Sequence, residues 1–376
     1  MLKGTSVLRE QNKRKILALV RRYQQTTRKD LLNEMDVSKN TISLAVDELI
    51  QDGVLEEIGI KDPSTKGRPK ILLQIKANSY KAIGITISKR IIAYSIINFD
   101  GTLIDRGEFE NDGTNAETTL QFTVQLIDRL LEKYDQIIGI GIGIPGIINE
   151  LEQKVSISVH LNWKDVTLDH FSRIDIPIFI QNSVNMGAHT AIEDENLYDH
   201  QSLFYVRISE GIGGAFILDD VLIPGHAGTA GEIGHISVDA EAPKCRCGQH
   251  GCLESLINIE QFKQEMERLD IKWKERNGFF QGIENDETLG NNLAKYGYYL
   301  GKSLVVVIHL LNPTVIVIDT PYNHVDSFQN ECLHYLDTHS LPRVYKDTAI
   351  IFSTKRYDIS RGAALSAIIN YEKFMY

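Results

Sequence analysis

The chain has 376 residues, of which 43% are hydrophobic, so it is long enough to bury a large core in about two or three domains. No apolar run reaches the roughly 18 residues that a membrane span needs, and the polar, basic N-terminus lacks the apolar core of a signal peptide. We therefore expect a cytoplasmic protein without a membrane partner, in which the cysteines stay reduced.

The formal net charge of −10 is unevenly distributed. Residues 1–75 contain 14 Lys and Arg against 10 Asp and Glu, whereas the remaining residues contain 26 against 40. A basic N-terminal part on an acidic body indicates that only the N-terminal part meets a polyanion. A solvated helical face would produce the same excess, so charge alone does not decide the matter.

The first 53 residues predict three helices. Residues 9–23 have an amphipathic pattern, and a short helix is expected from its N-cap Thr27 to Met35. Ser38 is placed to cap a third helix, which Gly53 ends. The apolar stripe of this third helix consists of Ile42, Ala45, Val46, Leu49 and Ile50.

A helix, a turn and an amphipathic helix of this length are typical of a helix-turn-helix unit, whose second helix enters the major groove of DNA. The early, outward part of that helix lies away from the apolar stripe. Its polar residues are the candidates for contacts to base edges: Lys39, Asn40, Thr41 and Ser43.

Two expected strands, residues 54–58 and 71–75, enclose a polar, basic loop. Such a hairpin after a recognition helix resembles the wing of winged-helix proteins. Lys66, Arg68 and Lys70 would then hold phosphate or enter a minor groove. The alternatives are a protein-interaction module or a solvated hairpin. We expect residues 1–75 to form a winged helix-turn-helix DNA-binding domain, followed by a linker over residues 76–81.

A second architecture is expected from Ala82 onward. Its first half predicts strands at 82–87, 91–99 and near Leu103, a helix at 117–134 and a strand at 137–144. The second half repeats this order with a strand at 203–208, a glycine turn at 211–214, a strand through Leu218, and a hairpin at Asp219 and Asp220 into residues 221–222. A helix at 292–311 and a strand at 315–318 follow. This duplication suits two α/β lobes, residues 82–200 and 201–376, with a cleft between them.

Three of the four cysteines and one histidine form an H-x9-C-x-C-x4-C motif, which consists of His235, Cys245, Cys247 and Cys252. Zn²⁺ prefers four tetrahedral thiolate and imidazole ligands, and a closed Cys3His set leaves no position for a catalytic water. We predict a structural zinc ion at this motif. The alternatives are a cluster of ordinary thiols, or His250 as a competing ligand.

The residues around this motif carry a family resemblance. Gly225, Gly228 and the run Gly231–His235 precede the cysteines, and Gly251–Glu254 closes the motif. From about Ala82 to the C-terminus the chain resembles the ROK family, which comprises repressors, open reading frames and sugar kinases. The resemblance implies a two-lobed, actin-like ATPase fold of the sugar-kinase type, with the C-terminal helix returning to the first lobe.

The resemblance also implies which residues a kinase would need. The family's first phosphate hairpin reads roughly G-x-D-x-G-G-T, but Thr86 replaces the aspartate here, and Ser88 and Lys89 replace the glycines. Ser183 stands where the N-D-x-N run has its catalytic aspartate, and it has no carboxylate to accept a proton. Asp319 and Thr320 follow a strand where kinases commonly have two glycines. We therefore predict that the chain is not an enzyme.

Sugar-contacting positions of the family are better preserved, namely Asn182, Glu232, His235 and Glu254. Amides and carboxylates suit hydrogen bonds to vicinal hydroxyls, and the zinc would fix the loop that presents His235 and Glu254. The alternative is that these side chains persist only to fold the zinc loop.

Together these features predict a sugar-responsive transcription repressor of a carbohydrate-utilisation operon, similar to the xylose-repressor branch of the family. It would bind a palindromic operator as a homodimer or higher homo-oligomer, and a sugar effector would shift the lobe geometry and hence the spacing of the heads. The alternatives are an ATP-dependent sugar kinase with an accessory head, or a regulator controlled by a partner protein instead of a sugar.

Overall fold

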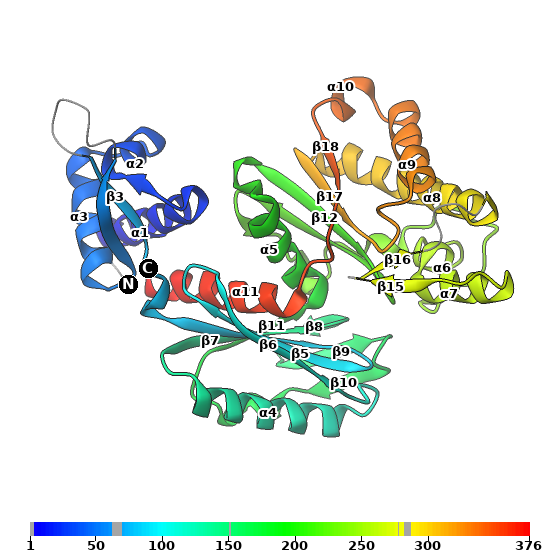
Figure 1. The fold of residues 1–376 in the computed structure, drawn as a ribbon, viewed down its shortest axis with the longest axis horizontal. Helices are drawn as coiled ribbons and strands as arrows, with labels where there is room; N and C mark the ends of the chain where they lie inside the picture. Colours follow the sequence, from blue (N-terminus) through cyan, green and yellow to red (C-terminus); the bar gives the residue numbers. More distant parts are fainter. Residues whose placement is uncertain (1–3, 62–69, 150–151, 277, 282–286) are drawn as a thin grey trace.

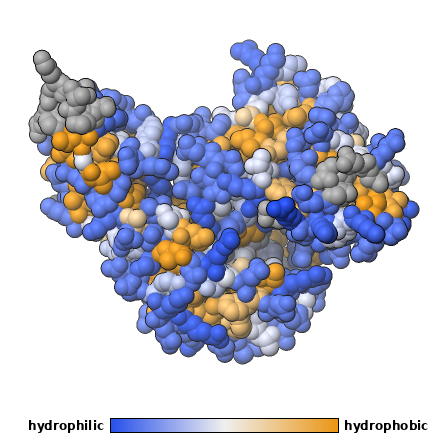
Figure 2. All heavy atoms as spheres, in the orientation of Figure 1, coloured by the Kyte–Doolittle hydropathy of each residue, from blue (hydrophilic) through white to orange (hydrophobic). Residues whose placement is uncertain are grey.

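We describe a computed structural model of the chain, which covers residues 4–61, 70–149, 152–276, 278–281 and 287–376. An N-terminal head lies beside a body of two lobes (Figure 1). In the space-filling view a deep notch separates the head from the upper part of the body (Figure 2). Within the described residues, no helix combines the length and apolarity that a membrane crossing requires.

The head contains three helices and one small sheet. Thr27 and Ser38 cap the second and third helices as predicted, because their side-chain oxygens accept from the backbone N–H groups of Asp30 and Thr41. The first helix begins five residues before the predicted start. The two-residue strand β1 was not predicted. It pairs with the second strand of the predicted hairpin, which gives the sheet the order β1-β3-β2. The elements are α1 (Gly4–Tyr23), β1 (Thr26–Thr27), α2 (Arg28–Glu34), α3 (Lys39–Gln51), β2 (Leu55–Lys61) and β3 (Lys70–Ile75).

The first lobe is built on a five-stranded sheet of order β11-β7-β4-β5-β6. A second, three-stranded sheet has the order β10-β9-β8. The elements are β4 (Lys81–Ile87), β5 (Ile91–Asn98), β6 (Leu103–Glu110), α4 (Ala116–Lys133), β7 (Ile137–Ile144), β8 (Ile147–Asn149), β9 (Lys154–Ser158), β10 (Trp163–Thr167), β11 (Ile178–Asn182) and α5 (Ser183–Glu195).

The second lobe has a five-stranded sheet of order β14-β13-β12-β17-β18. Its elements are β12 (Ser202–Ile208), β13 (Ile212–Leu218), β14 (Val221–Leu222), α6 (Glu254–Ile257), α7 (Ile259–Arg268), β15 (Lys274–Arg276), β16 (Phe279–Gln281), α8 (Glu287–Leu311), β17 (Val315–Asp319), α9 (Asp326–His339), α10 (Pro342–Tyr345) and β18 (Ala349–Phe352). The last helix of the chain, α11 (Ile359–Met375), follows this sheet.

The predicted duplication is present in the sheet topology. In each lobe the first strand pairs antiparallel with the second and parallel with the fourth: β4 with β5 and β7, and β12 with β13 and β17. The turn between β13 and β14 has positive φ at both Asp219 and Asp220, as a two-residue hairpin turn of type I′ requires. The two lobes are therefore two copies of one strand arrangement.

The predicted glycine turn at 211–214 is wrong after Gly211, because β13 already begins at Ile212. Gly213 and Gly214 lie within β13 and pair with Arg207 and Val206 of β12. A Cβ atom at Gly214 would come within 2.5 Å of the Phe204 ring, so a glycine here permits close packing in the sheet and does not mark a loop.

Helix α11 connects the first lobe to the head. It packs on β4, β7 and α5, on the opposite face of the sheet from α4 (Figure 1). At its C-terminal end Tyr376 donates a hydrogen bond to Asp52 of the head at 3.2 Å. Arg21 of α1 donates to the Phe99 carbonyl oxygen and to Glu372 at 2.8 and 2.6 Å. The head is therefore joined to the body by buried, specific contacts.

Candidate functional site

A cavity of about 560 Å³ lies between the two lobes. The first lobe contributes the β4–β5 hairpin and the start of α5, and the second lobe contributes β13 and the cysteine loop. All four predicted sugar-contacting residues line it, namely Asn182, Glu232, His235 and Glu254. The fold thus brings side chains that are distant in sequence to one cavity, of a size that accommodates a small sugar.

One wall of this cavity is the predicted metal motif. The ligand atoms of His235, Cys245, Cys247 and Cys252 all lie within 4.8 Å of one another, and His250 is not part of this group. The Cys247 and Cys252 sulfur atoms are 3.6 Å apart, and Cys245 Sγ lies 3.8 Å from His235 Nδ1. Four ligands around one Zn²⁺ require separations of about 3.5–3.8 Å. The donor set and these two separations therefore fit a tetrahedral metal ion.

Backbone turns fold the cysteine loop back on itself. The Cys245 N–H donates to the Gln249 carbonyl oxygen at 2.7 Å, and the Gly248 N–H donates to the Cys245 carbonyl oxygen at 2.9 Å. Gly251 has a φ of +70°, and a Cβ atom there would lie 1.8 Å from the Asp239 carbonyl oxygen, so only glycine fits. These turns bring the thiols together without any covalent link.

The two buried thiols of the motif, Cys245 and Cys252, have a raised pKa, whereas hydrogen bonds from its neighbours lower the pKa of the exposed Cys247. Burial, together with the neighbouring thiols of Cys247 and Cys245, raises the pKa of Cys252 to about 12. A divalent cation stabilises thiolates and reverses this effect. The two buried thiols are therefore suited to hold a cation and poorly suited to act as nucleophiles.

His235 faces both the metal group and the cavity. Its Nδ1 atom lies toward Cys245, while its Nε2 atom is 3.8 Å from Glu232 Oε2. Burial raises the pKa of Glu232, His235 opposes the rise, and the nearby Glu254 adds to it. Glu254 is 8% exposed and its Oε2 accepts the Ile212 N–H at 2.9 Å. A sugar hydroxyl in this corner would meet one imidazole and two carboxylates.

On the opposite wall, Asn182 and Ser183 mark the start of α5. The Asn182 amide accepts the Val184 N–H at 2.9 Å and donates to the Gly146 carbonyl oxygen at 3.0 Å. These bonds fix the amide, which still has one hydrogen and one lone pair for a ligand. Ser183 also lines the cavity, so the residue that the resemblance aligns with the family's catalytic aspartate faces the cleft with a hydroxyl group.

Sequence reasoning missed a buried ion-pair network beside the cavity. Asp319, which is fully buried, lies 2.5 Å from Arg207 and 2.9 Å from Arg356, and it accepts a hydrogen bond from Tyr205. The last residue of β17 thus holds two guanidinium groups. Arg207 also lines the cavity. The sequence did contain a signal for this network. Asp319 ends an otherwise apolar strand, and a buried carboxylate needs a cationic partner.

Four of the predicted DNA-contacting residues lie at the N-terminal end of α3, namely Lys39, Asn40, Thr41 and Ser43. Lys39 and Asn40 are exposed, and Lys70 is exposed at the start of β3. Thr41 and Ser43 are half-buried, and the Thr41 hydroxyl bonds to that of Ser38 at 2.8 Å. Lys66 and Arg68 lie outside the described residues.

The same outward face of α3 includes Leu44, which is 54% exposed and was not predicted. It follows Asn40 by four residues, so helical periodicity could have placed it on this face. Arg28 holds α3 in position, because it pairs with Asp47 at 2.8 Å and with Glu57 of β2 at 2.9 Å.

Comparisons with known proteins agree with the fold and the site. Residues 82–364 match the model of the ROK family. The body therefore has the actin-like fold of ROK kinases, and the chain belongs to the ROK family.

Among relatives, a xylose repressor from Caldicellulosiruptor bescii is 31% identical over 285 residues, covering 72% of this chain and 71% of the relative. A crystal structure of a ROK transcriptional regulator, a homologue of the E. coli MLC protein, covers 98% of both chains with a TM-score of 0.79 and 20% identity. The ROK hexokinase from Thermus thermophilus covers 78% of this chain and 99% of its own, with a TM-score of 0.62 and 19% identity.

Proposed function

We propose that this protein is a sugar-responsive, DNA-binding transcription repressor whose kinase-like body is catalytically inactive. One observation carries the proposal: a ROK cleft is lined by the four predicted sugar-contacting residues and by Ser183 in place of a carboxylate, and it is joined to a head that presents a polar helix face. The names of the relatives support it, because both the xylose repressor and the MLC homologue are described as regulators.

The head, residues 1–75, is proposed to act as a winged helix-turn-helix domain. Helix α3 would enter the major groove with Lys39, Asn40, Thr41 and Ser43 toward the bases, and the 61–70 loop would act as a wing with Lys66, Arg68 and Lys70. We add Leu44 to the base-contacting face, because an exposed leucine among polar residues suits the methyl group of thymine. Two heads on a palindromic operator require a homodimer or a higher homo-oligomer.

The body, residues 82–376 after the linker 76–81, is proposed to act as the sensor. Zn²⁺ held by His235, Cys245, Cys247 and Cys252 would fix the loop that presents Glu254 to the ligand. No step of a reaction is needed from this ion. A sugar that favours one lobe arrangement would shift the position of the heads, because α11 packs on the first lobe and ends against the head. Reduced thiols suit a cytoplasmic regulator.

The proposal can be tested with the purified protein. We expect it to select a palindromic sequence from a random duplex library, and one aldose or amino sugar from a panel to change the affinity of this operator in fluorescence anisotropy. Failure to select any sequence would refute DNA binding. Selection of an operator without a response to any sugar would favour control by a partner protein.

A sugar kinase with an accessory head is the second candidate, because the interlobe cavity is open and several solved relatives are kinases. We expect no ATP-dependent phosphorylation of the sugar panel, since Ser183 cannot accept the hydroxyl proton and Ser88 and Lys89 replace the glycines of the phosphate hairpin. A coupled assay with a ROK hexokinase as positive control checks this. Turnover near the enzyme median of about 10 per second would establish the kinase.

Glu254→Gln should remove the sugar response and leave operator affinity unchanged. Glutamine keeps an oxygen that accepts the Ile212 N–H, so the variant removes the charge without leaving a buried donor unpaired. When the sugar concentration is about 100 times the Kd, the free energy of unfolding of the wild type should rise by roughly 2.7 kcal/mol, which a thermal-shift assay detects. Glu267→Gln, an exposed change on α7, is the control. An unaltered shift in Glu254→Gln would place the sugar elsewhere.

A further inference from the structure

A cavity separate from the interlobe cleft lies between the head and the body. Its volume is about 830 Å³, and its walls come from α1, α5, α11 and the β13–β14 turn. It lies at the junction of head and body, where Figure 2 shows a notch. A neighbouring cavity of about 570 Å³ shares His189, Asp220 and Lys373 with it. Each of the two cavities has a volume within the range of small-molecule binding sites. We refer to the two together as the composite cavity.

The head side of this composite cavity is basic. Arg14, Ala18 and Arg22 follow one another at intervals of four residues, so they share one face of α1, and all three line the cavity. The small side chain of Ala18 leaves space between the two arginines. The Nε atoms of Arg14 and Arg22 are buried and have no acceptor within the described part of the chain. A buried N–H group without an acceptor is costly, so this wall is suited to a ligand with acceptor oxygens.

The body side adds two further basic groups, His189 and Lys373. Burial lowers the pKa of Lys373, and the charge of Arg14 lowers it further. Burial lowers the pKa of His189 to about 4, with Lys373 contributing, so His189 is a neutral hydrogen-bond donor at pH 7. Arg14 and Lys373 are therefore close enough to repel each other.

Five carboxylates line the cavity beside this pair, namely Glu193, Asp199, Asp219, Asp220 and Glu372. Glu372 is engaged by Arg21, and Asp199 is engaged by Arg22. Burial raises the pKa of Asp220, and Arg22 opposes that rise. Among the described residues, no carboxylate forms an ion pair with Arg14 or Lys373. These two cations, of which Lys373 is exposed and Arg14 is half-buried, are therefore available to bind an anion from solution.

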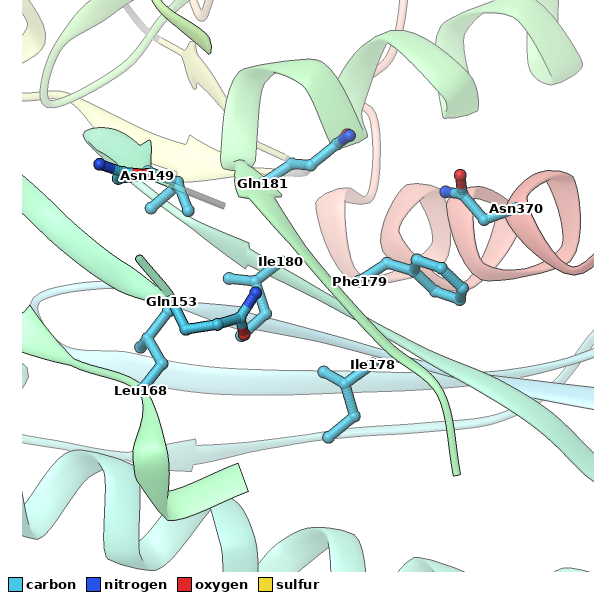
Figure 3. Close-up of a pocket in the computed structure, with 9 residues that line it drawn as sticks. Asn149, Gln153, Leu168, Ile178, Phe179, Ile180, Gln181 and Asn370 are labelled. Carbon is cyan, nitrogen blue, oxygen red and sulfur yellow. The ribbon is translucent and has the colours of Figure 1, made fainter. Parts of the chain in front are cut away.

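The far end of the composite cavity is rich in amides. Gln181 and Asn370 line both the neighbouring cavity and a smaller one of about 120 Å³, and they project into the space between β11 and α11 (Figure 3). Asn370 lies one helical turn before Lys373. The Oε1 atom of Gln181 is buried and has no donor within the described residues. Such amides are suited to hydroxyl groups, which both donate and accept.

We propose that the composite cavity is a second ligand site, which binds the phosphate ester of a sugar or of a similar polyol. Arg14 and Lys373 would hold the phosphate oxygens, with His189 as an additional N–H donor, and the amides of Gln181 and Asn370 would hold hydroxyl groups. Because Arg14 belongs to the head and Lys373 to the body, the bound ester would fix the head against the body. Its consequence for operator affinity rests on the proposed function, whereas the binding itself does not.

Calorimetry on the full-length protein without DNA tests the site. The probes are fructose 6-phosphate, inorganic phosphate and fructose at one ionic strength set with chloride. We expect fructose 6-phosphate to bind more tightly than inorganic phosphate. Arg14→Gln and Lys373→Gln should each weaken its binding about tenfold or more, since each removes a charge-assisted hydrogen bond. Arg129→Gln, which removes one exposed cation from α4, should leave the affinity unchanged.

The two substitutions lie on different domains, so a loss shared by both cannot come from damage to one of them. Equal affinity of fructose 6-phosphate for wild type and both variants would place it elsewhere and overturn the proposal, as would the absence of binding at millimolar concentration. Inorganic phosphate that binds as tightly as the ester would overturn the role of the amides. Since no DNA is present, a failure of the repressor hypothesis would not alter these results.

Discussion

A chain without residues 1–75 should lose all measurable affinity for the operator that the full-length protein selects. The truncated residues hold the basic excess and the exposed face of α3, while the remaining body is acidic and is repelled by DNA. For the intact protein, the logarithm of the affinity should fall with the logarithm of salt concentration by about 0.9 per phosphate contact. Fluorescence anisotropy from low to high salt measures both effects.

Removal of the head also uncovers apolar surface around Phe99 and Tyr371, so point variants in the full chain are needed as a companion. Asn40→Ala should cost roughly 1–3 kcal/mol on the operator and less on random DNA, because base-edge contacts carry discrimination. Asn33→Ala, an exposed asparagine on α2 of the same head, is the matched control. Undiminished operator affinity of the truncated chain would mean that another surface binds DNA, and the repressor hypothesis would fail.

Local signals in the sequence predicted the elements well. Thr27 and Ser38 are caps whose side chains satisfy backbone N–H groups of their own helices, so the signal lies within a few residues. The cysteine spacing is equally local, because the loop needs no other part of the chain to bring its thiols together. The candidate sugar site was predicted through family resemblance, which already contains the relative placement of Asn182 and Glu254.

Features that depend on contacts distant in sequence were not predictable. Gly213 and Gly214 look like a turn, but the neighbouring strand and the Phe204 ring decide that they are strand residues. Asp319 is buried only because Arg207 and Arg356 come to it from separate strands and loops. The cavity between α1 and α11 likewise arises where the chain's two ends meet, and no pattern in either helix predicts it.

Loss of the metal should affect the sensor more than any single change in the cleft. We expect about one Zn²⁺ per chain in the purified protein, and Cys247→Ser should lower the metal content and destabilise the body. Structural zinc sites contribute roughly 10–16 kcal/mol of apparent binding free energy in small peptides, which exceeds the total stability of many domains. Elemental analysis and thermal unfolding, read together, check this.

Cys332→Ala is the control, because Cys332 is fully buried in α9 and takes no part in the metal group. It should keep its zinc although its core packing is weakened. Acidification should release the metal from the wild type, since protons compete for the thiolates. Zinc loss should also abolish the sugar response, because Cys252 lies two residues before Glu254 and His235 belongs to both sites. A native protein that is fully folded and sugar-responsive without metal would show that the cysteine loop is shaped by its backbone turns alone.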